Sequence, residues 1–329
     1  MLKISRQMEE IMSSLINAIP GSVAQGLVWG LLAIGVYITY KVLDYSDLTV
    51  DGSLATGGAV GVMCIINGMS PYLALVMAFL AGMTAGLVTG LFHTIFGIPA
   101  ILSGILSQLG LYSINMRILG KSNQAVSVDQ YELIMSLRYI KEACFTGIVF
   151  CAIVIGLLYW FFGTEMGAAI RATGCNERMA RAQGINTSTQ KVFGLMLSNG
   201  LVGVAGCLYA QYQGSADVNM GRGAIVIGLA AVIIGEVLFG KIFRNFALRM
   251  TSAVIGAIIY FIATAIVIQI GLSTNDLKLF SALIVATFLA LPHLKSKYLS
   301  GTGRKGESTS AHEGVRISPA EKQGGRANA

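Results

Sequence analysis

The chain has 329 residues, of which 54% are hydrophobic and only 12% are charged, with a net charge of +7. Soluble domains carry roughly 25% charged residues, so a chain with a mean hydropathy of +0.70 must present much of its surface to lipid. This composition excludes a cytosolic enzyme, a secreted module and a disordered chain. The five cysteines are scattered and lack C-x-x-C spacing, which excludes a disulfide framework and a zinc site.

Apolar windows predict an all-α, polytopic integral membrane protein. No Asp, Glu, Lys or Arg occurs in the 65 residues from Gly52 to Met116, which suffice for about three crossings at ~20 residues each. The second predicted helix is short, so a tilted, re-entrant or broken segment is also consistent, and the count of about nine spans leaves eight or ten open. Breaks at Gly, Pro, Asn and charged residues place the helices at 22–40, 54–68, 72–93, 99–118, 144–163, 192–212, 222–240, 250–271 and 279–294.

Basic residues orient these spans, because cytoplasmic loops are enriched in Lys and Arg. A cytoplasmic C-terminus puts 15 of the 23 basic residues inside. With nine spans the N-terminus lies outside, and we expect residues 1–20 to form an interfacial helix. Residues 21–295 are then the transmembrane domain, and residues 296–329 a disordered, basic cytoplasmic tail near anionic lipid. No folded basic face accompanies this charge, so nucleic acid is not an expected partner.

Two segments resemble each other at an offset of 170 residues. Asp47-Leu-Thr-Val-Asp-Gly-Ser53 and Asp217-Val-Asn-Met-Gly-Arg-Gly223 each follow an apolar helix and precede a Gly-rich apolar run. In the predicted topology the first lies inside and the second outside, as an inverted repeat would produce. The sequence therefore predicts an inverted repeat, with a chance match as the alternative.

Polar residues within apolar segments are candidates for a translocation pathway, because they are costly in lipid and so tend to be functional. For Asp47 and Asp51 the alternative is capping of the helix that follows. For the amides the alternative is ordinary hydrogen bonding between helices. The candidates are Asp47, Asp51, Ser53, Asn67, Asn199, Gln211 and Asn219.

The polar, basic segment 164–190 predicts a short cytoplasmic helix. Residues Glu177 to Gln183 favour a helix, Asn176 suits its N-cap and Gly184 suits its end. A short amphipathic helix on this face could insert into a groove of a partner. A loop helix lying at the lipid headgroups is the alternative.

This loop resembles the cytoplasmic signature of the branched-chain amino-acid and sugar permease family of ABC transporters. Asp47 to Ala59 is similar to the family's first-half motif, and its residues resemble those of the tryptophan/tyrosine permeases. The resemblance spans roughly Gly21 to Pro292. Family members often end that motif differently from Asp51, so the substrates of sugar or branched-chain members do not carry over. The matching loop residues are Gly167, Ala169, Arg171, Ala172, Gly174, Asn176, Ala180, Gly184 and Ile185.

The resemblance implies the permease subunit of an ATP-binding-cassette importer in the bacterial cell (inner or plasma) membrane. Its partners would be a second copy in a homodimer, cytoplasmic ATPase subunits that contact the loop as a coupling helix, and an extracytoplasmic solute-binding protein. The expected solute is a small organic molecule, an aromatic or other hydrophobic amino acid. The alternatives are a sugar or nucleoside ABC permease, and a stand-alone secondary transporter or channel.

ATP and Mg are expected in the partner ATPase, so this chain is predicted to be no enzyme and to hold no cofactor or metal. Gly235 to Lys241 fits G-x-x-x-x-G-K, yet Ile242 stands where Ser or Thr would hold Mg²⁺. We expect Glu236 to form an interfacial ion pair with Lys241 or Arg244 instead.

Overall fold

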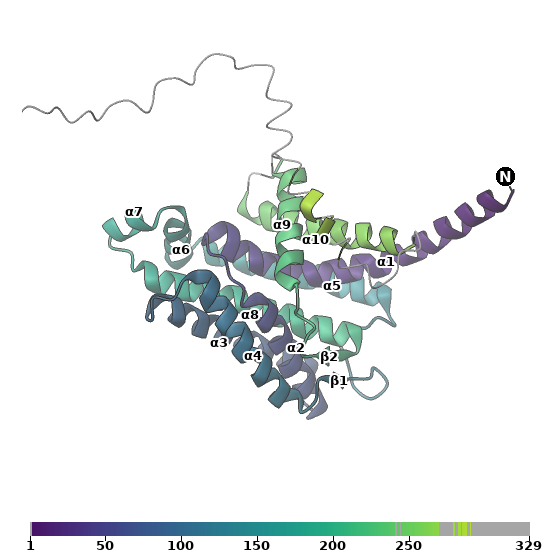
Figure 1. Ribbon diagram of the computed structural model, residues 1–329, viewed down its shortest axis with the longest axis horizontal. Coiled ribbons are helices and arrows are strands. Elements are labelled where there is room, and N and C mark those ends of the chain that lie inside the picture. Colours follow the sequence, from purple (N-terminus) through teal and green to yellow (C-terminus); the bar gives the residue numbers. More distant parts are fainter. Residues whose placement is uncertain are drawn as a thin grey trace, which may run out of the picture. The chain divides into compact units, whose positions relative to one another are not determined.

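The structure is a computed structural model that describes residues 2–240 (2–17 as backbone), 242–243 and 245–269, with 279, 282–283, 285–287 and 290 beyond them. This part of the chain is mostly helical (Figure 1). The helices are α1 (Leu2–Tyr37), continued by the π-helical turn η1 (Ile38–Val42), then α2 (Val50–Ile66), α3 (Pro71–Thr94), α4 (Ala100–Leu119), α5 (Ile140–Phe162), α6 (Glu165–Cys175), α7 (Glu177–Ala182), α8 (Thr187–Gln213), α9 (Ala224–Phe239) and α10 (Phe246–Gln269).

Each predicted apolar segment from 22–40 to 250–271 coincides with one of these helices, whereas 279–294 lies mostly outside the described residues. Among the described residues, α2 and α9 are shorter apolar helices. Within the described part of the chain, five segments are long and apolar enough to cross a membrane, judged by length and composition: Ala18–Val42, Pro71–Thr94, Ile140–Phe162, Thr187–Gln213 and Phe246–Gln269.

Two features differ from the predicted helices. The first helix does not begin near Gly21, because α1 runs continuously through Pro20; proline keeps a helical φ and removes only one backbone donor. Strand β1 (Asn123–Ala125) pairs antiparallel with β2 (Ser215–Asp217). Three-residue strands are too short to show an alternating pattern, which is why the sequence does not reveal them.

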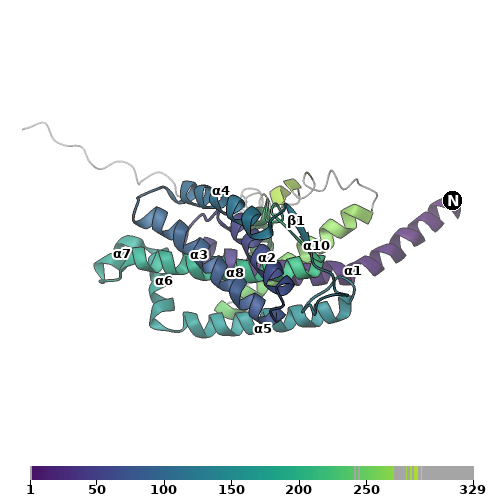
Figure 2. The same ribbon diagram turned by 90° about the horizontal axis from the view of Figure 1, so that it is seen from below.

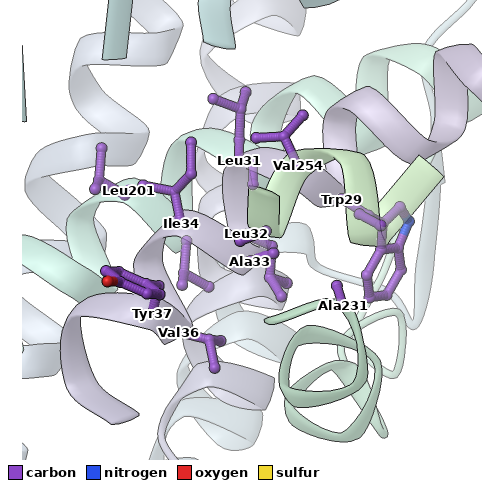
Figure 3. Packing of buried hydrophobic residues seen from close by; sticks show 14 of the residues in the cluster. Trp29, Leu31, Leu32, Ala33, Ile34, Val36, Tyr37, Leu201, Ala231 and Val254 are labelled. Carbon is purple, nitrogen blue, oxygen red and sulfur yellow. The ribbon is translucent and has the colours of Figure 1, made fainter. Parts of the chain in front are cut away.

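Helix α1 is the centre of the packing and contacts α5, α8, α9 and α10. Its Gly26 and Gly30 face Ile258 and Val254 of α10, at a distance that leaves no room for a Cβ. Figure 3 shows side chains of α1 packed with residues of three neighbours. The packed residues are Leu31, Leu32 and Ile34 of α1, Leu201 of α8, Ala231 of α9 and Val254 of α10.

A second packing centre joins α8 to α2 and α3, which lie beside it (Figures 1 and 2). A Cβ on Gly82 of α3 would collide with the backbone carbonyl of Asn199. A Cβ on Gly57 of α2 would collide with the backbone of Gly203 in the same way. Helices in lipid associate through such close backbone approach, so these glycines fix the positions of α2 and α3 on α8.

We predict that Gly57→Val destabilises the folded chain by about 3 kcal/mol, the upper end of overpacking penalties, because backbone cannot move aside for the added carbons. Gly110→Ala is the control, since a Cβ on Gly110 of α4 meets nothing within 4 Å; it should be neutral or gain up to ~1 kcal/mol of helix propensity. Unfolding in detergent, followed by size-exclusion profile and circular dichroism, measures both. Equal stability of the two variants would contradict this packing.

Candidate functional site

Three of the predicted pathway residues form one buried network between α8 and the start of α2. Asn199 Nδ2 donates to Asp47 Oδ2 at 2.7 Å, and Ser53 Oγ donates to Asn199 Oδ1 at 2.6 Å. The backbone N–H of Thr49 donates to Asp47 Oδ1 at 2.9 Å. The side chains of Asp47, Ser53 and Asn199 are at most 2% exposed. A carboxylate this deep is costly unless donors surround it, and here both oxygens have one.

The same network extends to α3 and α4. The hydroxyls of Thr49 and Thr89 lie 2.7 Å apart, and Thr89 Oγ1 donates to Ser107 Oγ at 2.7 Å. All of these residues are buried. One chain of hydrogen bonds therefore ties α2, α3, α4 and α8 together, and it fixes their register more strictly than apolar contacts could.

Asp51 caps a helix, but a different one from the helix that the sequence suggests. It lies in the first turn of α2, yet its carboxylate accepts from the backbone N–H groups of Gly223 and Ile225, each at 2.9 Å. These groups belong to the start of α9, where N–H donors have no partner within the helix. The N-termini of the two short apolar helices therefore meet at Asp51.

The other predicted pathway residues lie apart from this network. Gln211 is buried, and its Oε1 accepts from the backbone N–H of Ile134 at 3.0 Å, so it holds the segment between α4 and α5. Asn67 is exposed at the end of α2. Asn219 is exposed, and its N–H donates to Asp217 Oδ1 at 2.7 Å.

A cavity of about 370 Å³ lies between α2, α4 and the segment that precedes α9. Its wall includes Asn115 of α4, which is 1% exposed and whose Oδ1 and Nδ2 both lack a hydrogen-bond partner. Asn115 and Arg222 are not among the predicted pathway residues. Asn115 carries the same signal as the others, a polar residue in an apolar run, whereas Arg222 lies between apolar runs. The wall residues are Asp51, Gly52, Ala55, Gln108, Leu109, Tyr112, Asn115, Val218 and Arg222.

The predicted cytoplasmic loop contains two helices, α6 and α7, where the sequence predicts one. The predicted short helix is α7: the Asn176 side chain accepts from the N–H of Met179 at 3.1 Å, and Gly184 has a φ of +83° that ends the turn. The N–H of Ile185 closes this end on the carbonyl of Ala180 at 3.1 Å.

Helix α6 carries the first five residues of the signature, and its contacts explain three of them. A Cβ on Gly174 would collide with the carbonyl oxygen of Val42, and one on Gly167 with the backbone of Phe162. Arg171 Nη2 donates to the carbonyl of Phe162 at 2.9 Å. These residues dock α6 on η1 and on the end of α5. Ala169 and Ala172 are half-buried on the same helix.

An ion pair and a hydrogen bond join Glu177 of α7 to α8. Glu177 pairs with Lys191 at 2.8 Å and with Arg181 at 2.5 Å, and Thr187 donates to the same carboxylate at 3.3 Å. The hydrogen bond from Lys191 is the main cause that lowers the pKa of Glu177 below its usual range. Ala180 is buried beneath the helix, whereas Met179 is 62% exposed. Helix α7 is therefore anchored on one side and presents the other.

Among the described residues, no group of three or more His, Cys, Asp or Glu side chains could hold a metal ion. Glu236 does form an ion pair, with Lys41 of η1 at 2.7 Å. The expected partners Lys241 and Arg244 lie outside the described residues.

A family comparison identifies the chain. Residues 19–292 match the branched-chain amino acid transport system permease component. The chain belongs to this ABC-type permease family. It is therefore an integral membrane protein, in agreement with its apolar helices.

Relatives of this permease include proteins named for different solutes. It is 40% identical over 271 residues to the tyrosine transport system permease protein of Clostridioides difficile (strain R20291), covering 82% of this chain and 90% of that relative. It is 25% identical over 270 residues to the fructose import permease protein FruF of Bifidobacterium longum (strain NCC 2705), covering 79% and 73%. The solved structure of PsaBC from Streptococcus pneumoniae in complex with Fab has a TM-score of 0.48 at 17% identity, covering 89% of this chain and 99% of that chain.

We predict that Asn199→Leu destabilises the permease by about 3 kcal/mol, because the buried carboxylate of Asp47 loses a donor. Adding Asp47→Leu should recover part of this loss, since neither partner then remains unpaired. Asn67→Leu is the matched control at an exposed helix end, with a change within ~0.5 kcal/mol. Chemical unfolding in detergent measures the wild type, the single variants Asn199→Leu, Asp47→Leu and Asn67→Leu, and the double variant. Strictly additive effects of Asp47→Leu and Asn199→Leu would contradict the network.

Glu177→Gln should loosen α7 from α8. Two ion pairs of ~0.5 kcal/mol each are lost, one with Lys191 of α8 and one with Arg181 within α7, so amide hydrogen exchange across 177–187 should accelerate about two- to fivefold. Glu165→Gln at the start of α6 is the control. Because the pKa of Glu177 is lowered in the folded state, wild-type protection should be complete above the usual glutamate pKa and disappear as pH falls through the lowered value. Protection independent of both pH and Glu177 would contradict the anchoring.

Proposed function

We propose that this permease forms the translocation pathway of an ATP-driven importer for an aromatic or other hydrophobic amino acid. The proposal rests on helix α7, which is joined to α8 on one side and exposed on the other. A partner that pushes on α7 pushes directly on α8, because Glu177 and Lys191 join them. ATP and Mg²⁺ belong to separate ATPase subunits in this proposal, and the chain contributes the coupling loop.

The surface of α7 suits a groove that is apolar at its floor and acidic at its rim. Met179 is exposed, and Arg178 and Arg181 are exposed beside it. An exposed methionine flanked by cations adapts its shape to an apolar groove, while the cations find carboxylates at the edge. A loop helix at lipid headgroups would not need the ion-pair anchor that holds α7.

The positions of the basic residues support a cytoplasmic face at this end of the protein. Lys41, Arg171 and Arg249, all expected inside, line one cavity of about 530 Å³ together with Cys175. Figures 1 and 2 show α6 and α7 at the opposite end from β1, which lies in the segment between α4 and α5 that our topology places outside. We propose nine spans within residues 21–295, an outside N-terminal segment 1–20, and residues 296–329 as a cytoplasmic tail.

Repeated local geometry supports an inverted repeat. Asp47 Oδ1 accepts from the N–H of Thr49, and Asp217 Oδ1 accepts from the N–H of Asn219, the same bond at the offset of 170 residues. Each segment then leads into a short apolar helix, α2 or α9. The packing of the helices repeats as well. In the two halves α1 corresponds to α8 and α3 to α10, and α8 packs on α3 as α1 packs on α10. Two such halves can rock about a central site to give alternating access.

Tyrosine in the name of a relative that is 40% identical favours an aromatic amino acid as the solute. A sugar is the second candidate, favoured by the relative named for fructose at 25% identity. A second copy of the chain and an extracytoplasmic solute-binding protein complete the proposed importer. A stand-alone transporter would instead move solute without any ATPase.

Uptake of labelled L-tyrosine into liposomes tests the proposal. The permease should transport only with its ATPase, binding protein and ATP present. Arg178→Glu and Met179→Asp should lower uptake at least tenfold and abolish stimulation of ATP hydrolysis by the loaded binding protein, because the ATPase loses its contact on α7. Lys121→Glu in the opposite loop is the control. Uptake by the permease alone, driven by an ion gradient, would overturn the importer; fructose uptake in place of tyrosine would overturn the solute.

A further inference from the structure

The cavity beside Asn115 contains hydrogen-bonding capacity that the protein itself does not use. The Asn115 side chain offers two donors and an acceptor, and all are unpaired although the residue is buried. Leaving such groups unpaired is unfavourable, and more so in a chain surrounded by lipid. Among the described residues with unpaired buried side-chain atoms, Asn115 is the one whose oxygen and nitrogen are both without a partner.

Charges of both signs line the same wall. Asp51 presents a carboxylate, and Arg222 an exposed guanidinium that forms no ion pair among the described residues. The Asp51 carboxylate accepts backbone N–H groups at the start of α9, and of its about four lone-pair sites at least one remains for another donor. The two charged groups face one cavity without being paired with each other, an arrangement that fits a ligand carrying both charges.

The rest of the wall is apolar or aromatic. Leu109, Val218 and Ala55 supply aliphatic surface, and Tyr112 supplies a ring that is 42% exposed. The volume of about 370 Å³ lies within the range of small-molecule sites. A neutral sugar would leave both charges without a partner. An amino acid with an aromatic side chain uses the charges, the amide and the apolar surface together.

We propose that this cavity is a solute subsite for a zwitterionic aromatic amino acid, an inference that rests on the proposed function. Arg222 binds the carboxylate of the solute, Asp51 accepts from its ammonium group, and Asn115 forms hydrogen bonds with the polar end. The aromatic side chain packs on Tyr112 and Leu109. In the proposed topology, α4 ends on the extracytoplasmic side, so this subsite receives the solute released by the binding protein.

The complete importer in liposomes provides the test, with labelled L-tyrosine as the probe. Asn115→Leu and Arg222→Gln should each lower uptake at least tenfold, and Arg222→Lys should retain more activity than Arg222→Gln. Ser113→Leu, on the exposed face of α4, and Lys121→Gln are matched controls and should stay within twofold of wild type. Asn115→Leu should melt at the same temperature as wild type or higher, because it removes unpaired polar atoms from the interior.

A chemical readout reports occupancy independently of transport. Cysteine placed by Gln108→Cys, at a wall residue to which the proposal assigns no contact with the solute, should react with a small methanethiosulfonate, detected on its peptide by mass spectrometry. L-Tyrosine should slow this reaction at least fivefold, whereas tyramine, which lacks the carboxylate, should not. Wild-type uptake by both Asn115→Leu and Arg222→Gln, or an unprotected thiol at position 108, would overturn the subsite. Absence of tyrosine uptake by the wild-type importer would instead overturn the proposed function.

Discussion

Two apolar helices of this permease begin inside the packed bundle, and the rest of the arrangement depends on how their N-termini are satisfied. In lipid no water is available for the free N–H groups of a first helical turn. Asp51 supplies acceptors for α9, and Asp47 supplies one for the backbone that leads into α2. Each carboxylate must therefore lie where both of its partners can reach it. That requirement positions α2 against α8 and α9 before any apolar side chain is considered.

The sequence predicts the helices well because lipid imposes long apolar runs, and the breaks between them are marked by Gly, Pro and charge. It predicts α7 for a similar reason, since a cap and a terminating glycine are local signals. It does not predict which helix Asp51 caps. Gly223 lies 172 residues away along the chain, and no local pattern carries that pairing. The sequence also does not predict that the Asn115 side chain lacks hydrogen-bond partners, because its neighbours are known only from the fold.

The loop signature also acquires a different meaning in three dimensions. Gly167, Gly174 and Arg171 dock α6 on the chain itself, so they build a rigid base. The exposed face of α7 is formed by other residues, such as Met179, which is not among the loop residues that match the family signature. In the proposed importer, docking of the loop within the chain and contact with a partner would therefore use separate residues.

A short, continuous path leads from this base to the cavity. Gly174 of α6 packs against the carbonyl of Val42, where η1 ends, and the chain then runs directly to Asp47. Asp47 is bound to Asn199 of α8, the helix that α7 is fastened to, and two residues after Thr49 the chain reaches Asp51 at the cavity wall. A displacement of α6 and α7 therefore has two routes to Asp47, one through α8 and Asn199 and the other through η1, and the chain leads on from Asp47 to Asp51. Because packed interfaces shift between discrete arrangements and do not deform continuously, we expect movement at the loop to reposition Asp51 and α9 together and so, in the proposed importer, to link the state of the cavity to that of the partner.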